Sequence, residues 1–390
     1  MINKIIYIGY QPLTTKVIDD FYFIEANKRN YEIEYWDLTN IYFPNIEFSC
    51  IIEQFSVAIS DYKALEKKIK ENVHSETFFI PIVTFEFRVL NLFLLLTKYN
   101  CKTGFFGRGA LPLTTSVIST KHIKQKLLKL FDIKLLVSFM KNKYCEVLKV
   151  LKIVKPYELI FNAGEDGVKT IGYGCQVDIK NARIANINSF DFDKYKLTLE
   201  KANKFDVRYC LFLDEYLPFH PDFELLSIKT IEPKEYYDSL NKFFDIIEKK
   251  YSLKVIIAAH PKAEKYKGSD YFCGRKVCFN ETALLAKFAE FTIAHGSTSI
   301  SFSVLNSNPI LFLYTTSLQT VMPLYYTFIL NLSKLLGSIV LNIDDFLFED
   351  IIVNPIVESK YLNYKYKYLT STESESIISS EIFFKEISKF

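Results

Sequence analysis

No run of apolar residues in this sequence is long enough to cross a membrane as a helix. Such a helix needs roughly 20 mostly apolar residues in succession, and no stretch approaches that length, although 49% of the 390 residues are apolar. The apolar run at 5–9 is also too short for the core of a signal peptide, and no cleavage pattern follows it. We therefore expect a cytosolic protein whose first β-strand is 5–9.

Cysteine patterns that hold zinc or form a disulfide framework are missing as well. The seven cysteines are odd in number, none lies in a C-x-x-C sequence, and no Cys/His cluster has the spacing of a zinc site. Reduced thiols in the cytosol are the simplest explanation. Asp191-Phe192-Asp193 has the D-x-D form of some divalent-metal sites, but it lies in a polar connecting stretch without a neighbouring strand. We expect no metal there and no cofactor.

The overall charge is mild, and three enzyme signatures are absent. A net charge of +3 is too small to indicate nucleic-acid binding, because that needs a concentrated basic face. No Walker A, G-x-G-x-x-G or G-x-S-x-G sequence occurs, so the ATPase, dehydrogenase and hydrolase classes lack support. The 26 Tyr and 35 Phe suit a sugar-binding cleft. An A/T-rich genome also enriches these residues, and we favour that explanation.

Strand-like and helix-like segments alternate along the chain, which has room for two domains of ordinary size. Alternation of this kind indicates an α/β protein with mostly parallel sheets and right-handed crossovers. We expect strands at 5–9, 31–37, 77–83, 157–161, 208–213, 254–259, 291–294 and 309–313. We expect helices at 15–29, 63–72, 88–99, 233–250, 281–288 and 299–306, with Asn280 capping the one at 281.

The polar stretch 186–206 divides this alternation into two halves. We expect two Rossmann-like domains that face a central cleft, at 1–195 and 205–345. A tail, 346–390, follows them. From about residue 371 the tail is Ser-rich, and we expect a solvated link there and then a final helix that packs back on the N-terminal domain.

Residues 121–155 carry ten Lys against two acids, and apolar residues are interleaved with them. A basic amphipathic segment of this kind can lie on the surface of an anionic membrane. An ordinary surface helix, with its apolar face in the core and its lysines in water, is the alternative that we favour.

Polar groups follow two of the expected buried strands of the second half. The first strand ends at His260-Pro261, where a basic loop begins with Lys262, and the second ends at His295-Gly296. Ligands of open α/β sheets bind in the crevice at the carboxyl ends of the strands. The sequence therefore predicts a nucleotide crevice at this edge.

The side chains in these segments suit a phosphate group. An imidazole has an unperturbed pKa near neutrality, so His260 can donate a proton or a hydrogen bond to a leaving phosphate, and Pro261 fixes the exit of the strand. Ser297-Thr298-Ser299, at a strand-to-helix junction, can make an anion site with backbone N–H groups. Three plainer alternatives stay open: a strand-capping His260, a buried His295 and simple N-capping by a serine.

Carboxylates in both halves are further candidates. Glu281, at the start of a helix, can hold ribose hydroxyls, or it can simply lie favourably at a helix N-terminus. Glu165-Asp166 lies in a Gly-bounded loop after a strand of the first half. A carboxylate there can take a proton from an attacking hydroxyl, although Asp-Gly is also a common turn sequence.

An acidic pair before Gly, then His-Pro, then Ser-Thr, in this order, resembles bacterial sialyltransferases, polysialyltransferases and related glycosyltransferases of capsule and lipopolysaccharide synthesis. The resemblance covers mainly 208–313 and one loop of the first half. It implies two Rossmann-like domains (the GT-B type), with the acceptor on the N-terminal side and the nucleotide sugar on the C-terminal side. It also implies Glu165 as base, His260 at the donor phosphate, Glu281 at the nucleoside, and Ser297 and Thr298 at the phosphate.

The block from Phe212 to Asp222 departs from that pattern, which puts a CMP-sialic acid donor in doubt. It makes Asp214, Glu215 and His220 secondary site candidates, and His220-Pro221 is a second His-Pro.

The hypothesis from sequence is a cytosolic, inverting, metal-independent glycosyltransferase that moves a sugar from a nucleotide donor to a surface polysaccharide or a lipid-linked glycan. A location on the inner face of the plasma membrane, through 121–155, goes with the membrane alternative for that segment. Two other functions stay open. One is a teichoic-acid-type transferase of polyol or sugar phosphate, and the other is a non-catalytic polysaccharide assembly or binding protein.

Overall fold

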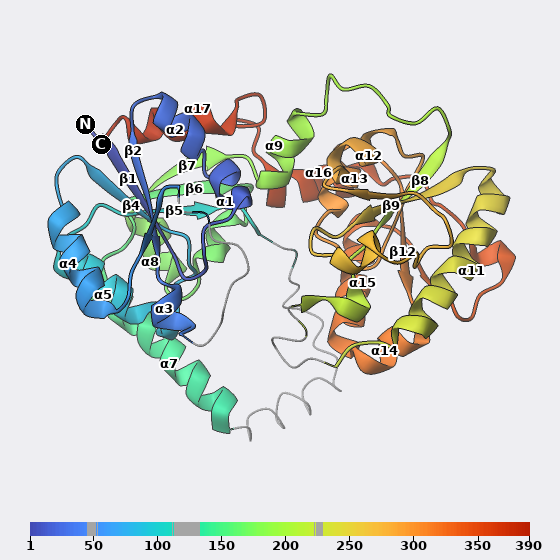
Figure 1. Ribbon diagram of the computed structural model, residues 1–390, viewed down its shortest axis with the longest axis horizontal. Helices are drawn as coiled ribbons and strands as arrows, with labels where there is room; N and C mark the ends of the chain where they lie inside the picture. The colour runs from blue at the N-terminus through green and yellow to red at the C-terminus, as the bar shows by residue number, and fades with distance from the viewer. Residues whose placement is uncertain (45–51, 53, 111, 113–132, 222, 224–228) are drawn as a thin grey trace. The chain divides into compact units, whose positions relative to one another are not determined.

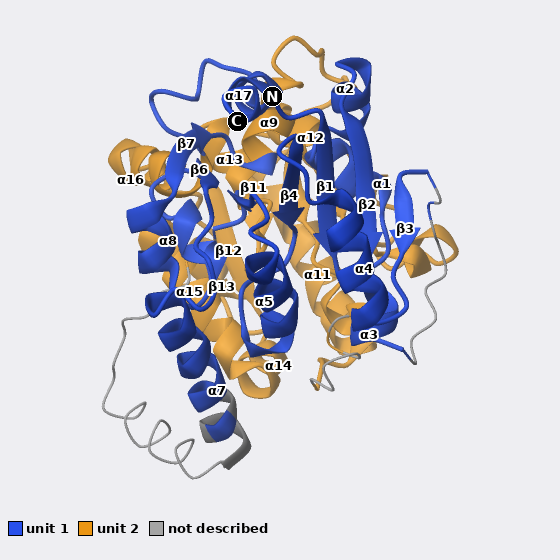
Figure 2. Cartoon of the chain, turned by 90° about the vertical axis from the view of Figure 1, so that its left-hand side faces the viewer, with its two compact units in different colours: residues 1–110, 116–190, 370–390 blue, residues 111–115, 191–369 orange. Residues whose placement is uncertain are grey.

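The computed structural model describes residues 1–44, 52, 54–110, 112, 133–221, 223 and 229–390 (Figure 1). The chain forms two compact units (Figure 2). Unit 1 contains the described residues of 1–110, 116–190 and 370–390, and unit 2 contains those of 111–115 and 191–369. Apart from 111–115, unit 2 is thus one continuous segment, which begins at Asp191 and ends before Thr370.

Unit 1 is built on seven parallel strands. Four of them form a sheet in the order β3-β2-β1-β4 and three form a sheet in the order β5-β6-β7. A parallel bridge between Phe79 and Thr103 joins β4 to the start of β5, so the two sheets adjoin. The strands are β1 Lys4–Gly9, β2 Glu32–Asp37, β3 Ser56–Ala58, β4 Thr77–Pro81, β5 Gly104–Gly107, β6 Leu159–Ala163 and β7 Arg183–Ile187.

Both faces of the unit 1 sheet are covered, which is why its strands are nearly continuous apolar runs. Ile6 and Ile8 of β1 belong to one core cluster, and Ile5 and Tyr7 belong to the other. Helices α4 and α5 cover the first face and α2 and α17 the second (Figure 1). The helices are α1 Thr15–Asp20, α2 Phe23–Lys28, α3 Thr39–Tyr42, α4 Tyr62–Asn72, α5 Leu90–Lys98, α7 Ile133–Val150, α8 Cys175–Asn181 and α17 Ser379–Ile387.

Two expectations for unit 1 are wrong. The single helix expected at 15–29 is two helices, because Tyr22 has a φ of 61°, and a left-handed residue cannot continue a right-handed helix. The Ser-rich stretch after 371 is not simply a solvated link, since Ser374 and Ser379 are buried. It leads into α17, whose Phe383 is fully buried in the second core cluster.

Unit 2 contains six parallel strands in the order β10-β9-β8-β11-β12-β13. Numbered from β8, this order is 3-2-1-4-5-6, the doubly wound arrangement in which the direction of winding reverses between the first and fourth strands. The α/β class with parallel sheets, predicted from the sequence, is confirmed. The strands are β8 Tyr209–Leu213, β9 Lys254–Ala259, β10 Val277–Phe279, β11 Thr292–Ala294, β12 Ile310–Tyr314 and β13 Val340–Asn342.

The helix predicted at 233–250 is α11, Pro233–Tyr251, and it buries the apolar face that its periodicity indicated. The cap predicted for the next helix is wrong, because Glu281 is the N-cap residue of α12, and Asn280 precedes it with a φ of 59°. The remaining helices are α9 Phe190–Lys196, α12 Thr282–Phe288, α13 Ile300–Leu305, α14 Thr316–Val321, α15 Pro323–Leu336 and α16 Glu358–Tyr364.

The D-x-D sequence lies in the first turn of α9 and not in a connecting loop. Residues two apart on a helix do not face each other, so Asp191 and Asp193 do not point to one side, and Phe192 between them is buried. Among the helices in the described part of the chain, none is both long and apolar enough to cross a membrane.

A buried ion pair lies under the first face of the unit 1 sheet. Lys149 of α7 and Asp178 of α8 are both fully buried, with Nζ 2.5 Å from Oδ2. The ammonium group also lies 4.3 Å from the ring centre of Phe85, and Asp178 accepts the N–H of Tyr157 at 3.1 Å. Burial lowers the pKa of Lys149 and raises the pKa of Asp178. Each charge therefore depends on the other for its place in the core.

Replacing Asp178 with Ala should destabilise the protein by about 3–5 kcal/mol, because it leaves the Lys149 ammonium buried without its counter-ion. The double change Lys149→Met and Asp178→Leu should cost much less, since no charge then stays in the core. Urea unfolding of the variants measures both. Glu146→Ala, which breaks an exposed pair on the same helix, is the control and should change stability by less than about 1 kcal/mol. Equal losses for the single and double core variants would contradict the account.

Candidate functional site

Three loops leave the carboxyl edge of the unit 2 sheet side by side. Asp214-Glu215 follows β8, His260 follows β9, and His295-Gly296 follows β11. Strand β8 lies between β9 and β11, and all three are parallel, so these segments emerge at one edge. The segments after β9 and β11, where the sequence predicted the nucleotide crevice, therefore lie on either side of the segment after β8. That segment carries two adjacent carboxylates.

Asp214 ties β8 to the loop that follows β9. It is buried, and its Oδ2 accepts the backbone N–H of His260 at 3.4 Å, while its Oδ1 accepts the hydroxyl of Tyr266 at 3.1 Å. Desolvation by burial raises the pKa of Asp214 to about 6, although these hydrogen bonds oppose the shift.

Glu215 ties β8 to the loop that follows β11, at the point where the winding reverses. Its Oε1 accepts the N–H of Gly296 at 2.8 Å, and its Oε2 accepts the hydroxyl of Tyr325. Desolvation raises the pKa of Glu215 to about 7, and the neighbouring Asp214 adds to the rise. Gly296, which the sequence placed in the nucleotide crevice, thus donates its N–H to a carboxylate of the protein itself.

The two His-Pro sequences come together at this edge. The rings of His220 and His260 lie with their centres 4.8 Å apart. Nδ1 of His260 accepts the N–H of Lys262 at 3.2 Å, so the proton of a neutral His260 ring is on Nε2. His260 is partly exposed, and Pro261 and Lys262 are exposed. His220, a secondary candidate from sequence, is therefore a neighbour of the principal one.

Of the two roles expected for His295, the structure favours that of a buried residue at a strand end. It is fully buried, its Nδ1 donates to the Leu313 carbonyl at 2.7 Å, and its Nε2 lies 2.9 Å from the hydroxyl of Tyr236. Burial lowers the pKa of His295 to about 4, so the ring is neutral at physiological pH. Both ring nitrogens are bonded inside the unit, which makes His295 a structural residue of the strand end.

The hydroxyl residues after Gly296 divide into buried and exposed positions. Ser297 is buried, and its Oγ accepts the N–H of Ser299 at 3.2 Å, which is a turn-capping role. Ser299 is the N-cap residue of α13, and Thr298 is exposed. Of these three residues, Thr298 is the most exposed, and Ser299 is partly exposed.

The carboxylates expected elsewhere lie apart from this cluster. Glu281 follows β10 at the same edge of the sheet, and its Oε1 pairs with Nζ of Lys204 at 2.6 Å. Glu165 and Asp166 belong to unit 1, in the turn after β6, where Glu165 is exposed and Asp166 pairs with Lys169 at 2.6 Å. The structure therefore groups His260, His220, Asp214 and Glu215, and leaves Glu165 and Asp166 in the other unit.

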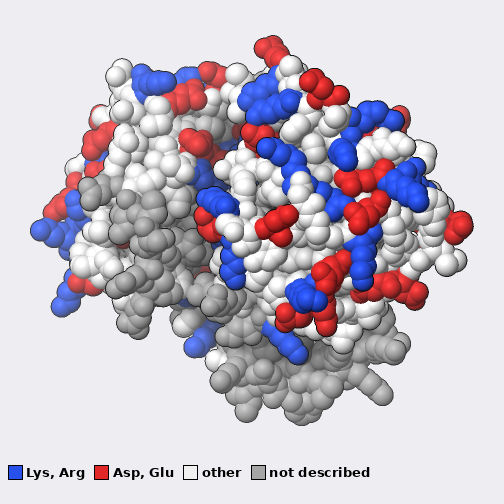
Figure 3. Space-filling model, turned by 45° about the vertical axis from the view of Figure 1, so that its right-hand side comes forward, with Lys and Arg blue, Asp and Glu red and all other residues white. Residues whose placement is uncertain are grey.

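No metal centre is evident in the part of the chain that the structure describes. There, no group of three or more His, Cys, Asp or Glu side chains is arranged to hold an ion, and six cysteines are free thiols. On the face shown in Figure 3, positive and negative side chains are interspersed, without a large patch of one sign.

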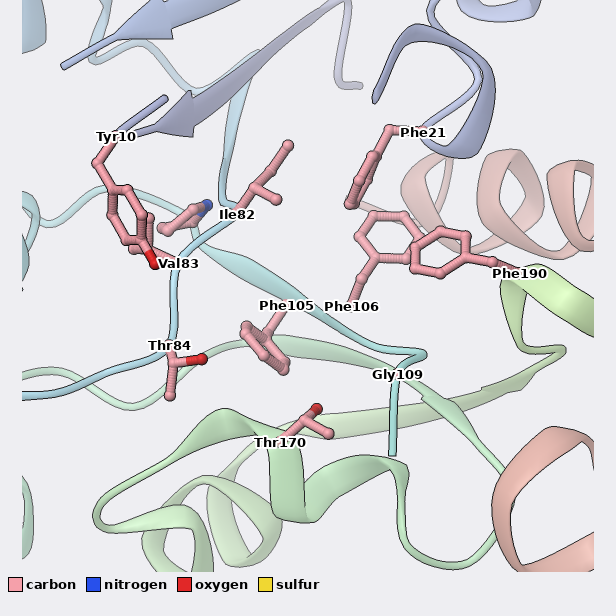
Figure 4. A pocket seen from close by; sticks show the side chains of 11 residues that line it. Tyr10, Phe21, Ile82, Val83, Thr84, Phe105, Phe106, Gly109, Thr170 and Phe190 are labelled. Atoms are coloured by element: carbon pink, nitrogen blue, oxygen red, sulfur yellow. The ribbon is translucent and has the colours of Figure 1, made fainter. Parts of the chain in front are cut away.

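Unit 1 has its own cavity, of about 260 Å³, which the sequence did not reveal (Figure 4). It lies where β1 and β4 end, which is the reversal point of this unit's strand order. The Phe21 ring forms one wall, with its centre 5.1 Å from that of Phe106 and 5.6 Å from that of Phe190. The other lining residues are Tyr10, Pro81, Ile82, Val83, Thr84, Phe105, Gly109 and Thr170.

A buried arginine supports the aromatic wall of this cavity from behind. The guanidinium carbon of Arg108 lies 4.2 Å from the ring centre of Phe190, and its Nε donates to the carbonyl of Asn188 at 2.6 Å. No charged side chain is among the described residues that line the cavity itself. The cavity therefore offers aromatic faces and a few hydroxyls to a ligand.

The sequence matches no protein-family model and no curated protein. Among solved structures, the chain is similar to the UDP-GlcNAc 2-epimerase of Methanocaldococcus jannaschii in complex with UDP-GlcNAc and UDP (13% identity, 99% of both chains, TM-score 0.46). It is also similar to the calicheamicin glycosyltransferase CalG4 (9%, 99% of this chain and 98% of that, 0.49) and to the wall teichoic acid polymerase TagF (9%, 99% and 89%, 0.48). At identities of 9–13% and TM-scores of 0.46–0.49, these similarities assign no function to this chain.

The raised pKa values of Asp214 and Glu215 make stability depend on pH. Below about pH 3 both carboxyls are protonated in the folded and in the unfolded protein. As the pH rises further, the unfolded chain loses these protons near its ordinary values of 3.8 and 4.5, while the folded protein keeps them until about 6 and 7. Stability contributed by these groups should therefore fall between about pH 4 and 7, by a few kcal/mol in total.

Glu215→Gln removes one of the two groups. The free energy of unfolding of the variant, relative to that of the wild type, should be higher at pH 8 than at pH 5 by about 1–3 kcal/mol. The melting temperatures should differ in the same direction. Thermal unfolding in matched buffers gives this difference. Glu235→Gln, at an exposed position of the same unit, is the control. A Glu215→Gln difference that does not vary with pH would show that the carboxyl titrates normally in the folded protein.

Proposed function

We propose that this chain is a glycosyltransferase that uses a nucleotide-sugar donor, and that unit 2 binds the donor. One observation carries the proposal. In a doubly wound sheet the nucleotide site lies at the carboxyl edge, where the winding reverses, and at this edge the loops after β8 and β9 bring together His220, His260 and exposed Lys262. Histidine and lysine donors suit the phosphates of a nucleotide.

In this proposal His260 acts on the departing phosphate. Its Nδ1 already accepts a backbone N–H, so its Nε2–H is the group that donates to a phosphate oxygen. Thr298 adds an exposed hydroxyl, and Glu281 contacts the nucleoside. Residues 205–345 form the donor side and residues 1–195 the acceptor side.

The cavity in unit 1 supports an acceptor site on that side. Aromatic faces bind the C–H face of a sugar ring, and hydroxyls such as those of Thr84 and Thr170 bind sugar hydroxyls. Glu165, in the same unit, is the base that takes the proton of the acceptor hydroxyl. Among the described residues, the lining has no charged side chain to meet a phosphate, so a neutral glycan end suits it better than the polyol phosphate of a teichoic-acid-type transferase. Phosphorus retained in the product would identify the latter.

The finer form of the proposal follows from the motif order. The transferred sugar is sialic acid or a related sugar from a CMP donor, the reaction inverts the anomeric centre by direct attack, and it needs no metal. The acceptor is a surface polysaccharide or a lipid-linked glycan in the cytosol, as capsule and lipopolysaccharide synthesis require.

A thermal-shift screen with CMP, UDP, GDP and dTDP tests donor binding. The matching nucleotide should raise the melting temperature by mass action, with a stabilisation of about 2.7 kcal/mol at a concentration of 100 times Kd. A thermal shift with CMP alone would support the sialyltransferase-like form of the proposal. A shift with UDP alone would indicate a different sugar donor. No shift with any nucleotide, together with intact glycan binding, would indicate a non-catalytic polysaccharide-binding protein.

His260→Ala should lower the rate of sugar transfer from the nucleotide found in that screen by ~10²–10⁴, because a positioned acid–base or hydrogen-bonding group is lost. The rate is measured from nucleotide release and product formation. His74→Ala, which removes an exposed histidine of unit 1, is the control and should leave the rate unchanged. Near-normal transfer by His260→Ala would exclude His260 from the mechanism.

A further inference from the structure

Helix α7 has two apolar faces, of which only one is in the core. Cys145 and Leu148 pack into the first core cluster of unit 1. Val137, Met140, Tyr144, Val147 and Leu151 follow one another at alternating spacings of three and four residues, which places them along one side of a helix. Each of these five side chains is 42–63% exposed. We call them the outer stripe.

The outer stripe is the centre of the largest gathering of exposed apolar side chains in the described residues. Of the 24 large apolar side chains exposed there, eight lie within residues 137–153. Scattered exposed apolar residues are ordinary, but a contiguous group indicates an interaction site. Figure 1 shows α7 at the edge of unit 1, with its first turns extending away from the sheet. The remaining three members of the group are Phe139, Val150 and Ile153.

This finding bears on the two interpretations of 121–155. The favoured one put the apolar residues in the core and the lysines in water. In the described part of the segment it holds for Cys145 and Leu148, which are in the core, and for Lys141 and Lys143, which are exposed. It fails for the outer stripe, which is exposed, and for Lys149, which is buried. The physical reason is the Asp178 carboxylate, which holds Lys149 in the core. Residues 121–132 lie outside the described residues.

The charge of this region identifies the partner. Residues 133–155, the described part of the segment, carry six lysines and one acid, a net +5. Asp178 neutralises the buried Lys149, which leaves +4, and the acid on α7, Glu146, is already paired with Lys143 at 2.6 Å. A second copy of the chain docked through the same helix would bring two such positive surfaces against each other. An anionic surface would instead be attracted.

We infer that the outer stripe of α7 is a docking surface for an anionic lipid bilayer. The apolar side chains enter the boundary between head groups and acyl chains, with aromatic Tyr144 and Phe139 at the level where such rings are enriched. Exposed lysines such as Lys141 and Lys143 reach the lipid phosphates. This surface goes beyond the proposed transfer reaction, because binding to a bilayer needs neither nucleotide nor acceptor.

Flotation of the full-length protein with vesicles tests the inference. Vesicles of phosphatidylcholine with about 30% phosphatidylglycerol should carry the protein upward in a density gradient. Pure phosphatidylcholine vesicles, or about 0.5 M salt with the anionic vesicles, should carry roughly tenfold less, because the lysine contribution is absent or screened.

Met140→Glu combined with Val147→Glu should abolish flotation on the anionic vesicles, with a loss of at least about tenfold. Both positions are exposed, so the variant should keep the wild-type melting temperature. Leu324→Glu, at an exposed position of α15, is the matched control and should float like the wild type. Lys141→Gln combined with Lys143→Gln should weaken binding by roughly tenfold.

Failure of the wild type to float on anionic vesicles would overturn the inference. Equal binding to neutral vesicles would overturn the assignment of an anionic surface. If the wild type sediments as a dimer, fails to float, and is made monomeric by Met140→Glu and Val147→Glu, the stripe is an interface between copies. Nucleotide-induced thermal shifts do not depend on these results, so the docking surface and the proposed transferase activity can fail separately.

Discussion

The candidate site depends on two adjacent carboxylates at the end of one buried strand. Asp214 bonds the loop on one side of β8, and Glu215 bonds the loop on the other side. The hydrogen bonds offset only part of the desolvation cost of each carboxylate, so the pKa of each is raised. Because these carboxyls hold both flanking loops by backbone N–H groups, the positions of His260 and Gly296 follow from them. Loss of either carboxyl would therefore free a whole loop from its hydrogen bond to the end of β8.

The same constraint of parallel winding has different consequences in the two units. Each unit has one point where its strand order reverses, and loops separate there. In unit 2 that point is closed by hydrogen-bonded carboxyls and bordered by imidazoles. In unit 1 it stays open as a cavity walled by phenylalanine rings. The same winding rule thus yields one polar candidate site in unit 2 and one aromatic candidate site in unit 1.

Helix α7 shows how a buried charge changes the meaning of an amphipathic pattern. Lys149 could not be distinguished from its nine lysine neighbours by sequence, since its burial depends on Asp178, 29 residues further along. Lys149 lies on the inward side of α7 together with Cys145 and Leu148, while the outer stripe lies on the exposed side.

The sequence alone determined the alternation of strands and helices, because periodicity and local composition are short-range signals. It therefore indicated the α/β class, the buried face of α11 and the strand ends that carry His260 and Ser297. Strand order was decided only by tertiary packing, which placed β8 between β9 and β11 and so moved Asp214, Glu215 and His220 from secondary to central positions. Tertiary packing also decided that His295 is buried, that Gly296 binds a carboxylate and that scattered phenylalanines enclose a cavity. Each of these depends on contacts between residues far apart in the chain, which no local pattern encodes.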